Sequence, residues 1–163
     1  MKCALLGVGI QASSPDEAIG DSDDLLICLI HKIDELCQKG PTDFYTNLRY
    51  GVNLWCAEIV AVLKMEYLNI SLHAVVSADQ PPCADGDIYR WRYDDVIKAC
   101  DSVICLQEES DDGTDPASLL DLYMIKLADT VLAVNSNDPT ENLFDTDTLL
   151  RCVDITQKQI VQL

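Results

Sequence analysis

The sequence has little positive charge: 11 Lys and Arg stand against 28 Asp and Glu, which gives a formal net charge of −17 and a pI near 4.1. Such a surface repels the phosphates of nucleic acids and of anionic lipids. We therefore expect neither a nucleic acid nor a membrane among the partners of this protein. A small anion can still bind, because a few backbone N–H groups are enough to hold it.

Long hydrophobic runs are also absent, and none approaches the ~20 residues that a membrane-spanning helix needs. The opening MKCALLGVGI is apolar enough to suggest a signal peptide, but it lacks a proper cleavage region, and residues 11–24 are acidic and polar. We interpret this opening as a first buried strand, and we expect the protein to be cytoplasmic.

The eight cysteines lack the spacings typical of a disulfide scaffold or a metal centre, with no CxxC pair and no cysteine–histidine cluster. Most lie within apolar stretches, such as Cys28 in LLICLI and Cys105 in VICL. A free thiol packs there as a small hydrophobic group. We expect reduced, mostly buried thiols and no metal site, as in a cytoplasmic protein.

The length and composition fit one globular domain that spans residues 1–163. Of the 163 residues, 48% are apolar, and a chain of this size hides roughly 70% of the surface that its unfolded form exposes. Disorder is therefore excluded for most of the chain.

Strand-like apolar runs alternate with segments of helical period. We predict strands at 3–10, 42–46, 71–78, 100–107, 128–136 and 159–163, and helices at 21–40, 52–68, 88–100, 117–128 and 146–155. Continuously apolar strands between long helices indicate a parallel sheet that is covered on both faces. The predicted fold is a three-layer α/β sandwich with a mostly parallel sheet, and ligands of such sheets bind at the carboxyl ends of the strands.

Two of these units share a pattern. Asp101 and Asp129 each open an Asp-x-Val sequence directly after a helix and before an apolar strand. The pattern marks the place where each of these strands begins.

The segment FYTNLRYGVNLWCAE, residues 44–58, predicts a strand, a polar turn and a helix. The first N–H groups of a helix have no internal partner and lie at its positive end, so such a turn can bind an anion. Glycine lets the ligand approach the backbone, and Gly51 is the glycine of this turn. The alternative reading takes Gly51 as a tight turn, Asn53 as a helix cap and Glu58 as a solvated helix residue.

The segment resembles the motif of the YpsA-like family in the SLOG superfamily, which is related to the DprA and LOG proteins. That motif reads F-x-S-G-x-A-x-G-x-D and is followed by A-E. The matching positions in this sequence are Phe44, Thr46, Gly51, Asn53, Ala57 and Glu58. The segments AVVSADQ, RYDDVIKACD and YMIKLADTVLAV resemble further parts of the family, so that roughly residues 30–135 are covered.

The resemblance implies a single Rossmann-like domain that binds or senses a nucleotide or a nucleotide-derived ligand. It places a tyrosine, Tyr93 here, at the mouth of the ligand site. Together with the predicted carboxyl edge of the sheet, it gives the candidate ligand-binding residues Gly7, Gly9, Thr46, Asn47, Gly51, Asn53, Glu58 and Tyr93. Related folds often self-associate, and we expect a homo-oligomer.

The departures from the family concern the ligand motif itself. The Ser-Gly of the family is Thr46-Asn47 here, its Asp is Asn53, and a family Asn falls on Asp121. The turn at 135–148, which normally receives phosphate or ribose, contains no glycine. The usual ligand therefore binds differently or not at all.

The catalytic signature PGG-x-GT-x-x-E of the LOG group is absent. This absence favours binding over catalysis and leaves no catalytic residue to nominate. Two alternatives stay open: a LOG-like N-glycoside hydrolase that acts on nucleoside monophosphates, and a degenerate module that works by protein–protein contact. A nucleophilic triad is not expected either, because His31 and His73 have no Ser or Cys partner at a recognisable spacing.

Overall fold

The structure is a computed structural model that describes residues 1–8, 22–40, 42–78, 87–107, 116–135 and 159–162. Its six-stranded sheet has the order β4-β3-β2-β1-β5-β6, and every pair of neighbouring strands is parallel. The strands are β1 (Lys2–Val8), β2 (Thr42–Thr46), β3 (Ile70–Ser77), β4 (Ser102–Leu106), β5 (Thr130–Asn135) and β6 (Gln159–Gln162).

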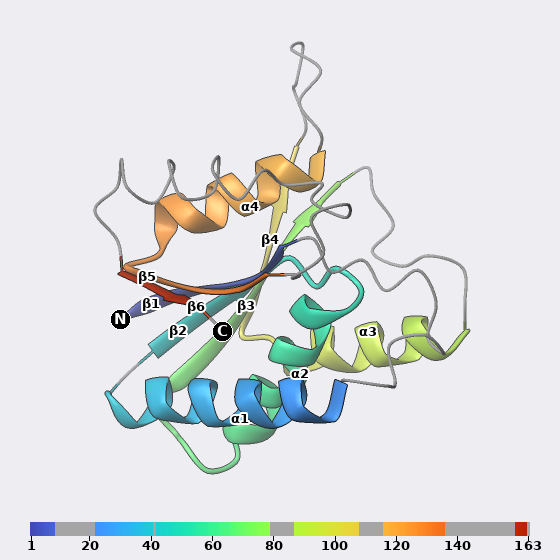
Figure 1. Cartoon of the computed structure of the whole chain (residues 1–163). Coiled ribbons are helices and arrows are strands. Elements are labelled where there is room, and N and C mark those ends of the chain that lie inside the picture. Colours follow the sequence, from blue (N-terminus) through green and yellow to red (C-terminus); the bar gives the residue numbers. More distant parts are fainter. Residues whose placement is uncertain (9–21, 41, 79–86, 108–115, 136–158, 163) are drawn as a thin grey trace.

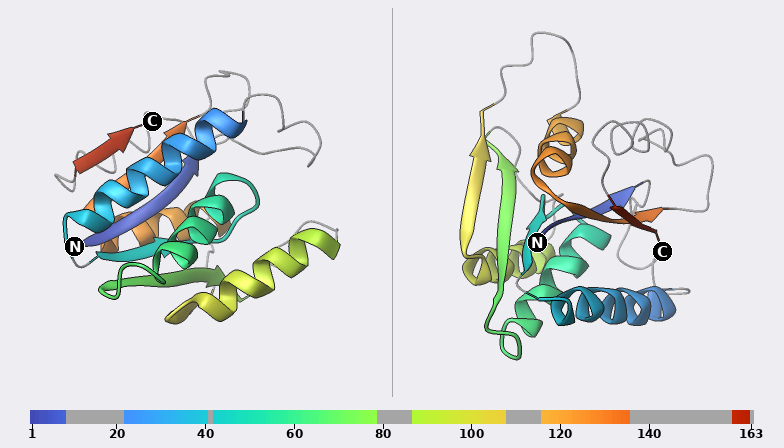
Figure 2. Two further views of the ribbon diagram at one scale, coloured as in Figure 1. Left: turned by 90° about the horizontal axis from the view of Figure 1, so that it is seen from below. Right: turned by 90° about the vertical axis from the view of Figure 1, so that its left-hand side faces the viewer.

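Helices cover both faces of this sheet (Figures 1 and 2). One face carries α1 (Ser22–Gln38), α2 (Val52–Leu63) and α3 (Asp87–Ala99), and the other carries α4 (Pro116–Leu127). The predicted three-layer Rossmann-like α/β sandwich is confirmed. The helix predicted at 146–155 lies outside the described residues.

Alternate strand residues build a separate core on each face, because side chains of a strand point to opposite sides of a sheet. Phe44 and Leu72 belong to the core beneath α1, α2 and α3, whereas Tyr45 and Val75 belong to the core beneath α4. Burial on both faces explains why the strands read as continuous apolar runs instead of alternating ones.

The end of α2 differs from the prediction. The helix ends at Leu63, whereas its apolar pattern extends to about Leu68. Met65 and Leu68 prolong that pattern, yet their exposed fractions are 80% and 94%. They lie in the connection to β3 and contribute nothing to the core, so their apolar character gave a misleading signal.

The Asp-x-Val pattern has a structural cause. The N–H of Asp101 donates to the Leu72 carbonyl at 2.7 Å, and the Leu72 N–H donates back to the Asp101 carboxylate at 2.8 Å. Asp129 and Lys2 repeat this exchange at 2.8 and 2.9 Å. In both cases the aspartate directly precedes a strand and binds one residue of the neighbouring parallel strand through its own N–H and its carboxylate.

The cysteines correct one expectation. Among the described residues, six cysteines are free, and Cys28 and Cys105 are exposed although both stand in apolar runs. Cys105 lies on the edge strand β4, which has a neighbour on one side only. Cys3 and Cys56 are buried as expected, and burial raises the pKa of each thiol to about 12.

None of the helices in the described ranges combines the length and the apolar character that a membrane span requires. No group of three or more His, Cys, Asp or Glu side chains in the same ranges could hold a metal ion.

The chain order places a topological switch point beside β1. The chain moves from β1 outward through β2 and β3 to β4, and then returns to β5 on the other side of β1. Open α/β sheets bind their ligands outside the carboxyl ends of the strands at such a point. Gly7 pairs with Val134 close to this end of the two strands, so the predicted ligand edge and the switch point coincide.

Candidate functional site at the carboxyl edge of the sheet

The turn between β2 and α2 forms the centre of the candidate site. Gly51 has φ 92° and ψ −135°, a conformation that residues with a side chain rarely adopt. Among the described residues no side chain caps the N-terminus of α2, and its first turn holds no acidic residue. The positive end of the α2 dipole is therefore free of a carboxylate of its own helix.

Asn53 does not cap α2. It lies in the first turn of the helix, and its side chain reaches back to β1, where its Oδ1 accepts the N–H of Gly7. The small size of Gly7 allows this approach: a Cβ there would lie 3.0 Å from the Cβ of Val52 and 3.1 Å from the Oδ1 of Asn53. Gly7 is thus required by close packing between β1 and α2, not by its own backbone angles.

A chain of side-chain hydrogen bonds continues from Asn53. Its Nδ2 donates to the Oδ1 of Asn47 at 2.6 Å, and the Nδ2 of Asn47 donates to the Oδ1 of Asp121 at 2.7 Å. The exposed fractions of Asn47, Asn53 and Asp121 are 4%, 4% and 7%. Each amide donates and accepts within the network, which fixes the orientation of both amides. The network joins β1, the β2–α2 turn and α4.

The remaining polar atoms of the turn are used within it. The hydroxyl of Thr46 donates to the backbone carbonyl of Asn53 at 3.2 Å and accepts the N–H of Leu48 at 3.2 Å. The Oδ1 of Asn47 also accepts the N–H of Arg49 at 3.0 Å. The hydroxyl and amide that the sequence suggested for a ligand therefore also hold the turn in shape.

Glu58 has a partner that the sequence did not indicate. It lies on α2 and forms a bidentate ion pair with Arg92 of α3, at 2.7 Å to Nε and 2.5 Å to Nη2. The hydrogen bond to Glu58 raises the pKa of Arg92 and outweighs the opposing effect of burial. Glu58 is therefore not a merely solvated residue, and its carboxylate is already neutralised by a guanidinium.

Two tyrosines meet beside this ion pair. The hydroxyl of Tyr50 donates to that of Tyr89 at 2.9 Å. The two rings pack edge to face, with 4.3 Å between their centroids and 76° between their planes. Burial and the bond to Tyr89 raise the pKa of Tyr50 to about 12. Tyr93, which the resemblance suggested, is partly buried against the core beneath α1, α2 and α3. Tyr89 precedes it by one helical turn, a spacing that would have justified naming both.

The predicted site residues thus fall into separate groups. One group lies together at the carboxyl edge and consists of Gly7, Thr46, Asn47, Gly51 and Asn53. Glu58 instead forms its ion pair with Arg92, and Tyr93 packs against the core. Gly9 lies outside the described residues. Asp121, which the sequence marked only as a departure from a family pattern, completes the buried network. Whether these residues bind a ligand stays a prediction.

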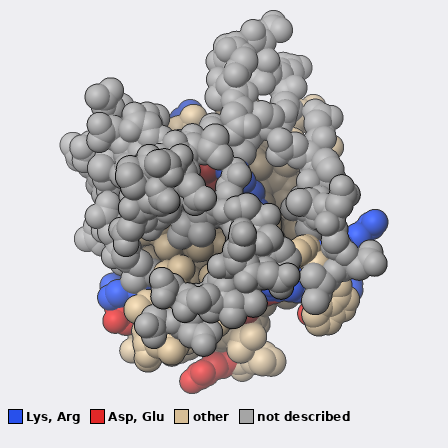
Figure 3. All heavy atoms as spheres, turned by 45° about the vertical axis from the view of Figure 1, so that its right-hand side comes forward, with Lys and Arg blue, Asp and Glu red and all other residues tan. Residues whose placement is uncertain are grey.

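The surface charge on one face of the molecule favours anion binding by a few groups of the turn over binding by a continuous basic surface. On the face drawn in Figure 3, the visible basic side chains of the described residues lie at separate places, some of them beside acidic ones, and form no continuous basic area. An anionic ligand would therefore depend on the backbone N–H groups of the turn and on single arginines. Arg49, half-buried in the turn itself, is such an arginine.

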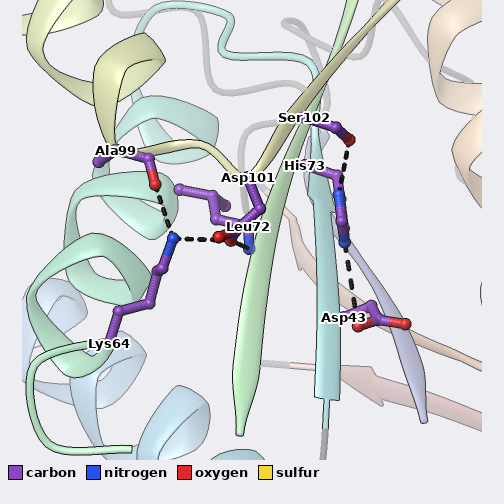
Figure 4. A network of polar contacts seen from close by, with 7 residues as sticks. All are labelled: Asp43, Lys64, Leu72, His73, Ala99, Asp101 and Ser102. Atoms are coloured by element: carbon purple, nitrogen blue, oxygen red, sulfur yellow. Dashed lines mark hydrogen bonds and ion pairs between the residues drawn. The ribbon is translucent and has the colours of Figure 1, made fainter. Parts of the chain in front are cut away.

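A second group of polar side chains lies away from this edge (Figure 4). His73 of β3 contacts Ser102 of β4, with 2.7 Å between its Nδ1 and the serine Oγ. The two residues are register partners in the parallel ladder. No fixed sequence spacing reveals such a pair, which is why the sequence gave His73 no serine partner.

Comparison with known proteins gives one similarity at the level of sequence. No protein-family model matches the chain. UPF0398 protein BH1768 of Halalkalibacterium halodurans is 25% identical over 103 residues, which are 63% of this chain and 54% of that protein. The chain spans about half the length of this curated relative. This chain is therefore a Rossmann-like α/β domain with distant similarity to a UPF0398 protein.

Proposed function

We propose that this chain is a domain of the YpsA-like SLOG type that binds or senses a nucleotide or a nucleotide-derived ligand at the carboxyl edge of its sheet, and that this site is non-catalytic. The observation that carries the proposal is the meeting of Gly7, Gly51 and the first turn of α2 at the switch point of the sheet. The distant similarity to a UPF0398 protein supports it. The ligand would place an anionic group at the start of α2.

The electrostatics of the turn favour an anion there. The first turn of α2 has neither a capping side chain nor an acidic residue in the described part of the chain, and its dipole adds about half a positive charge at that end. Gly51 brings no side chain that would shield the backbone. These features act locally and do not require a basic surface, which the net charge of −17 rules out.

The structure offers less support for catalysis. Glu58 is the carboxylate of the resembled motif on α2, and it is held in a bidentate ion pair by Arg92. A general acid or base must contact the substrate directly or through one water. Both carboxylate oxygens of Glu58 already accept hydrogen bonds from Arg92, which opposes such a contact.

The hydrogen bond that Asn53 already makes leads us to expect weak binding of the ligand. Its Oδ1 already accepts the Gly7 N–H, so a ligand oxygen at this position must displace an amide oxygen. The net gain of such an exchange is small, because one hydrogen bond replaces another. We expect affinities in the micromolar to millimolar range at best.

Charge reversal in the turn tests the proposal. Arg49→Glu places a carboxylate beside the start of α2, and Arg90→Glu is the matched control, since Arg90 is exposed on α3. Calorimetric titration with a panel of nucleoside mono- and diphosphates should show affinity roughly tenfold lower for Arg49→Glu, as one lost charge-assisted bond implies. Arg90→Glu should bind within about twofold of the unaltered protein because of salt screening.

Absence of binding to every nucleotide at millimolar concentration would contradict the proposal and favour the protein-contact alternative. Base release from nucleoside monophosphates that is lost in Glu58→Gln would instead establish the hydrolase.

A further inference from the structure

His73 of β3 lies between two polar side chains, one on each of the two neighbouring strands (Figure 4). Its Nδ1 lies 2.7 Å from the Oγ of Ser102 on β4, and its Nε2 lies 3.9 Å from the Oδ1 of Asp43 on β2. Tyr45, the register partner of His73, belongs to the core beneath α4, and Asp43 precedes it by two residues. The three side chains therefore share the α4 face of the sheet, near the amino ends of the strands.

The carboxylate selects the tautomer of the imidazole. A negative charge beside Nε2 favours the tautomer that carries its proton on Nε2. In that tautomer Nδ1 is unprotonated and accepts the hydroxyl proton of Ser102. The Ser-His part has the geometry of a Ser-His-Asp triad with the two ring nitrogens exchanged, whereas Asp43, at 3.9 Å from Nε2, acts on the imidazole through its charge and not through a hydrogen bond.

The packing fixes the imidazole and leaves the hydroxyl open. The ring of His73 stacks on Tyr45, with 4.8 Å between centroids and 26° between planes, and 18% of its side chain is exposed. Ser102 is exposed. Its position is fixed by Asp101, whose carboxylate accepts Leu72 N–H and contacts Lys64 at 2.6 Å.

We propose that Ser102 is a nucleophilic serine, with His73 as its general base and Asp43 as a positioning residue. The Oγ of Ser102 attacks the carbonyl carbon of an ester while its proton passes to His73 Nδ1. The ester C–O bond breaks, and the alkoxide leaves with that proton, so that an acyl-serine and an alcohol remain. Water then attacks the acyl-serine with the same proton transfers and releases the carboxylic acid.

The surrounding charge limits the substrate class. Asp43 lies close to His73 on this face, whereas the carboxylate of Asp101 pairs with Lys64 at the end of α2. Tyr45, which stacks on His73, has its pKa raised by burial and by nearby Asp43, Tyr123 and Asp129. Carboxylates on this face repel anions. The substrates that fit are therefore small uncharged esters, in contrast to the anionic ligand proposed for the opposite edge.

A fluorophosphonate that reports on reactive serines tests this inference. The serine Oγ bonds to phosphorus and fluoride leaves, and peptide mass spectrometry locates the adduct. We expect an adduct on Ser102 in the folded protein and none on Ser71, the half-buried serine of the neighbouring strand. His73→Gln should lower the labelling rate about 100-fold, the usual size of general-base assistance. Asp43→Asn should lower it by a smaller factor.

The second histidine provides a matched control. The chain has only two histidines, and His31 is exposed on α1, so His31→Gln should be labelled at the unaltered rate. Labelling of Ser102 no faster than that of Ser71, or labelling that is unchanged in His73→Gln, would overturn the inference.

Two esters of opposite character test the substrate class. p-Nitrophenyl acetate, which is uncharged, should acylate Ser102 faster than the anionic mono-p-nitrophenyl succinate does. The reverse order would refute the substrate class.

Discussion

The two edges of the sheet use similar polar contacts in different surroundings. At the carboxyl edge, the hydrogen bond between Asn53 and Asn47 is buried, and the bond from the Gly7 N–H to Asn53 is partly buried. At the amino edge, Asp101 and Asp129 bind the N–H groups of neighbouring strands while remaining exposed. A buried polar group that loses its partner costs about 1–3 kcal/mol, whereas exposed ion pairs contribute at most about 1 kcal/mol. Burial, not the type of bond, therefore decides which edge controls stability.

The largest effect should come from Asn53→Leu, which keeps the approximate shape and removes both polar atoms. The N–H of Gly7 loses the acceptor that it has in this network, and the Oδ1 of Asn47 loses one of its donors. We expect the free energy of unfolding to fall by about 3 kcal/mol, as urea denaturation would measure it. Asn69→Leu is the control, because Asn69 is exposed before β3, and it should change stability by less than about 0.5 kcal/mol. Equal losses for the two variants would remove the distinction between the edges.

The amino edge allows a sharper comparison between its two aspartates. Asp101→Asn keeps an acceptor for the Leu72 N–H but removes the charge that pairs with Lys64. Within the described part of the chain no ion pair joins Asp129, so Asp129→Asn loses no such partner. We expect a loss of at most about 1 kcal/mol for Asp101→Asn and a smaller one for Asp129→Asn, measured by the same denaturation. A larger loss for Asp129→Asn would contradict this account.

The Asp101 pair also has a pH dependence of known sign. Burial alone would raise the pKa of Asp101, but hydrogen bonds from Lys64 and Leu72 outweigh it, so the pKa is lowered. A lowered folded-state pKa contributes stability that is complete above the unfolded value of about 3.9 and is lost as the pH falls through the folded value. The stability difference between Asp101→Asn and the unaltered protein should therefore be complete above about pH 4 and disappear as the pH falls through the lowered pKa of Asp101. A difference that persisted at pH 2 would assign the effect to a cause other than charge.

Much of the fold follows from the sequence because both faces of the sheet are covered. Continuous apolar strands and intervening helices determine the order of elements and the parallel sheet, which the structure confirms. The end of α2 and the exposure of Cys28 and Cys105 were predicted incorrectly. In each case an apolar run was taken as evidence of burial, although exposure depends on which elements pack nearby.

The location of the candidate site could be predicted from the sequence, but its side-chain contacts could not. A strand end followed by a glycine turn and a helix locates Thr46, Asn47, Gly51 and Asn53 at the carboxyl edge. The bond between Asn47 and Asp121 joins residues 74 positions apart. The contact of His73 with Ser102 depends on strand register. Such pairs follow from tertiary packing, which no local pattern encodes.

The central claim is that the start of α2 beside Gly7 receives an anionic, nucleotide-derived ligand. An NMR titration of the ¹⁵N-labelled protein with nucleotides tests it most directly, because the Gly7 N–H and the side-chain amides of Asn47 and Asn53 give separate signals. The account predicts that these signals and the amides of residues 51–54 shift together and saturate, while the amides of β4 stay unchanged. Shifts confined to other parts of the chain, or none at millimolar nucleotide, would contradict it.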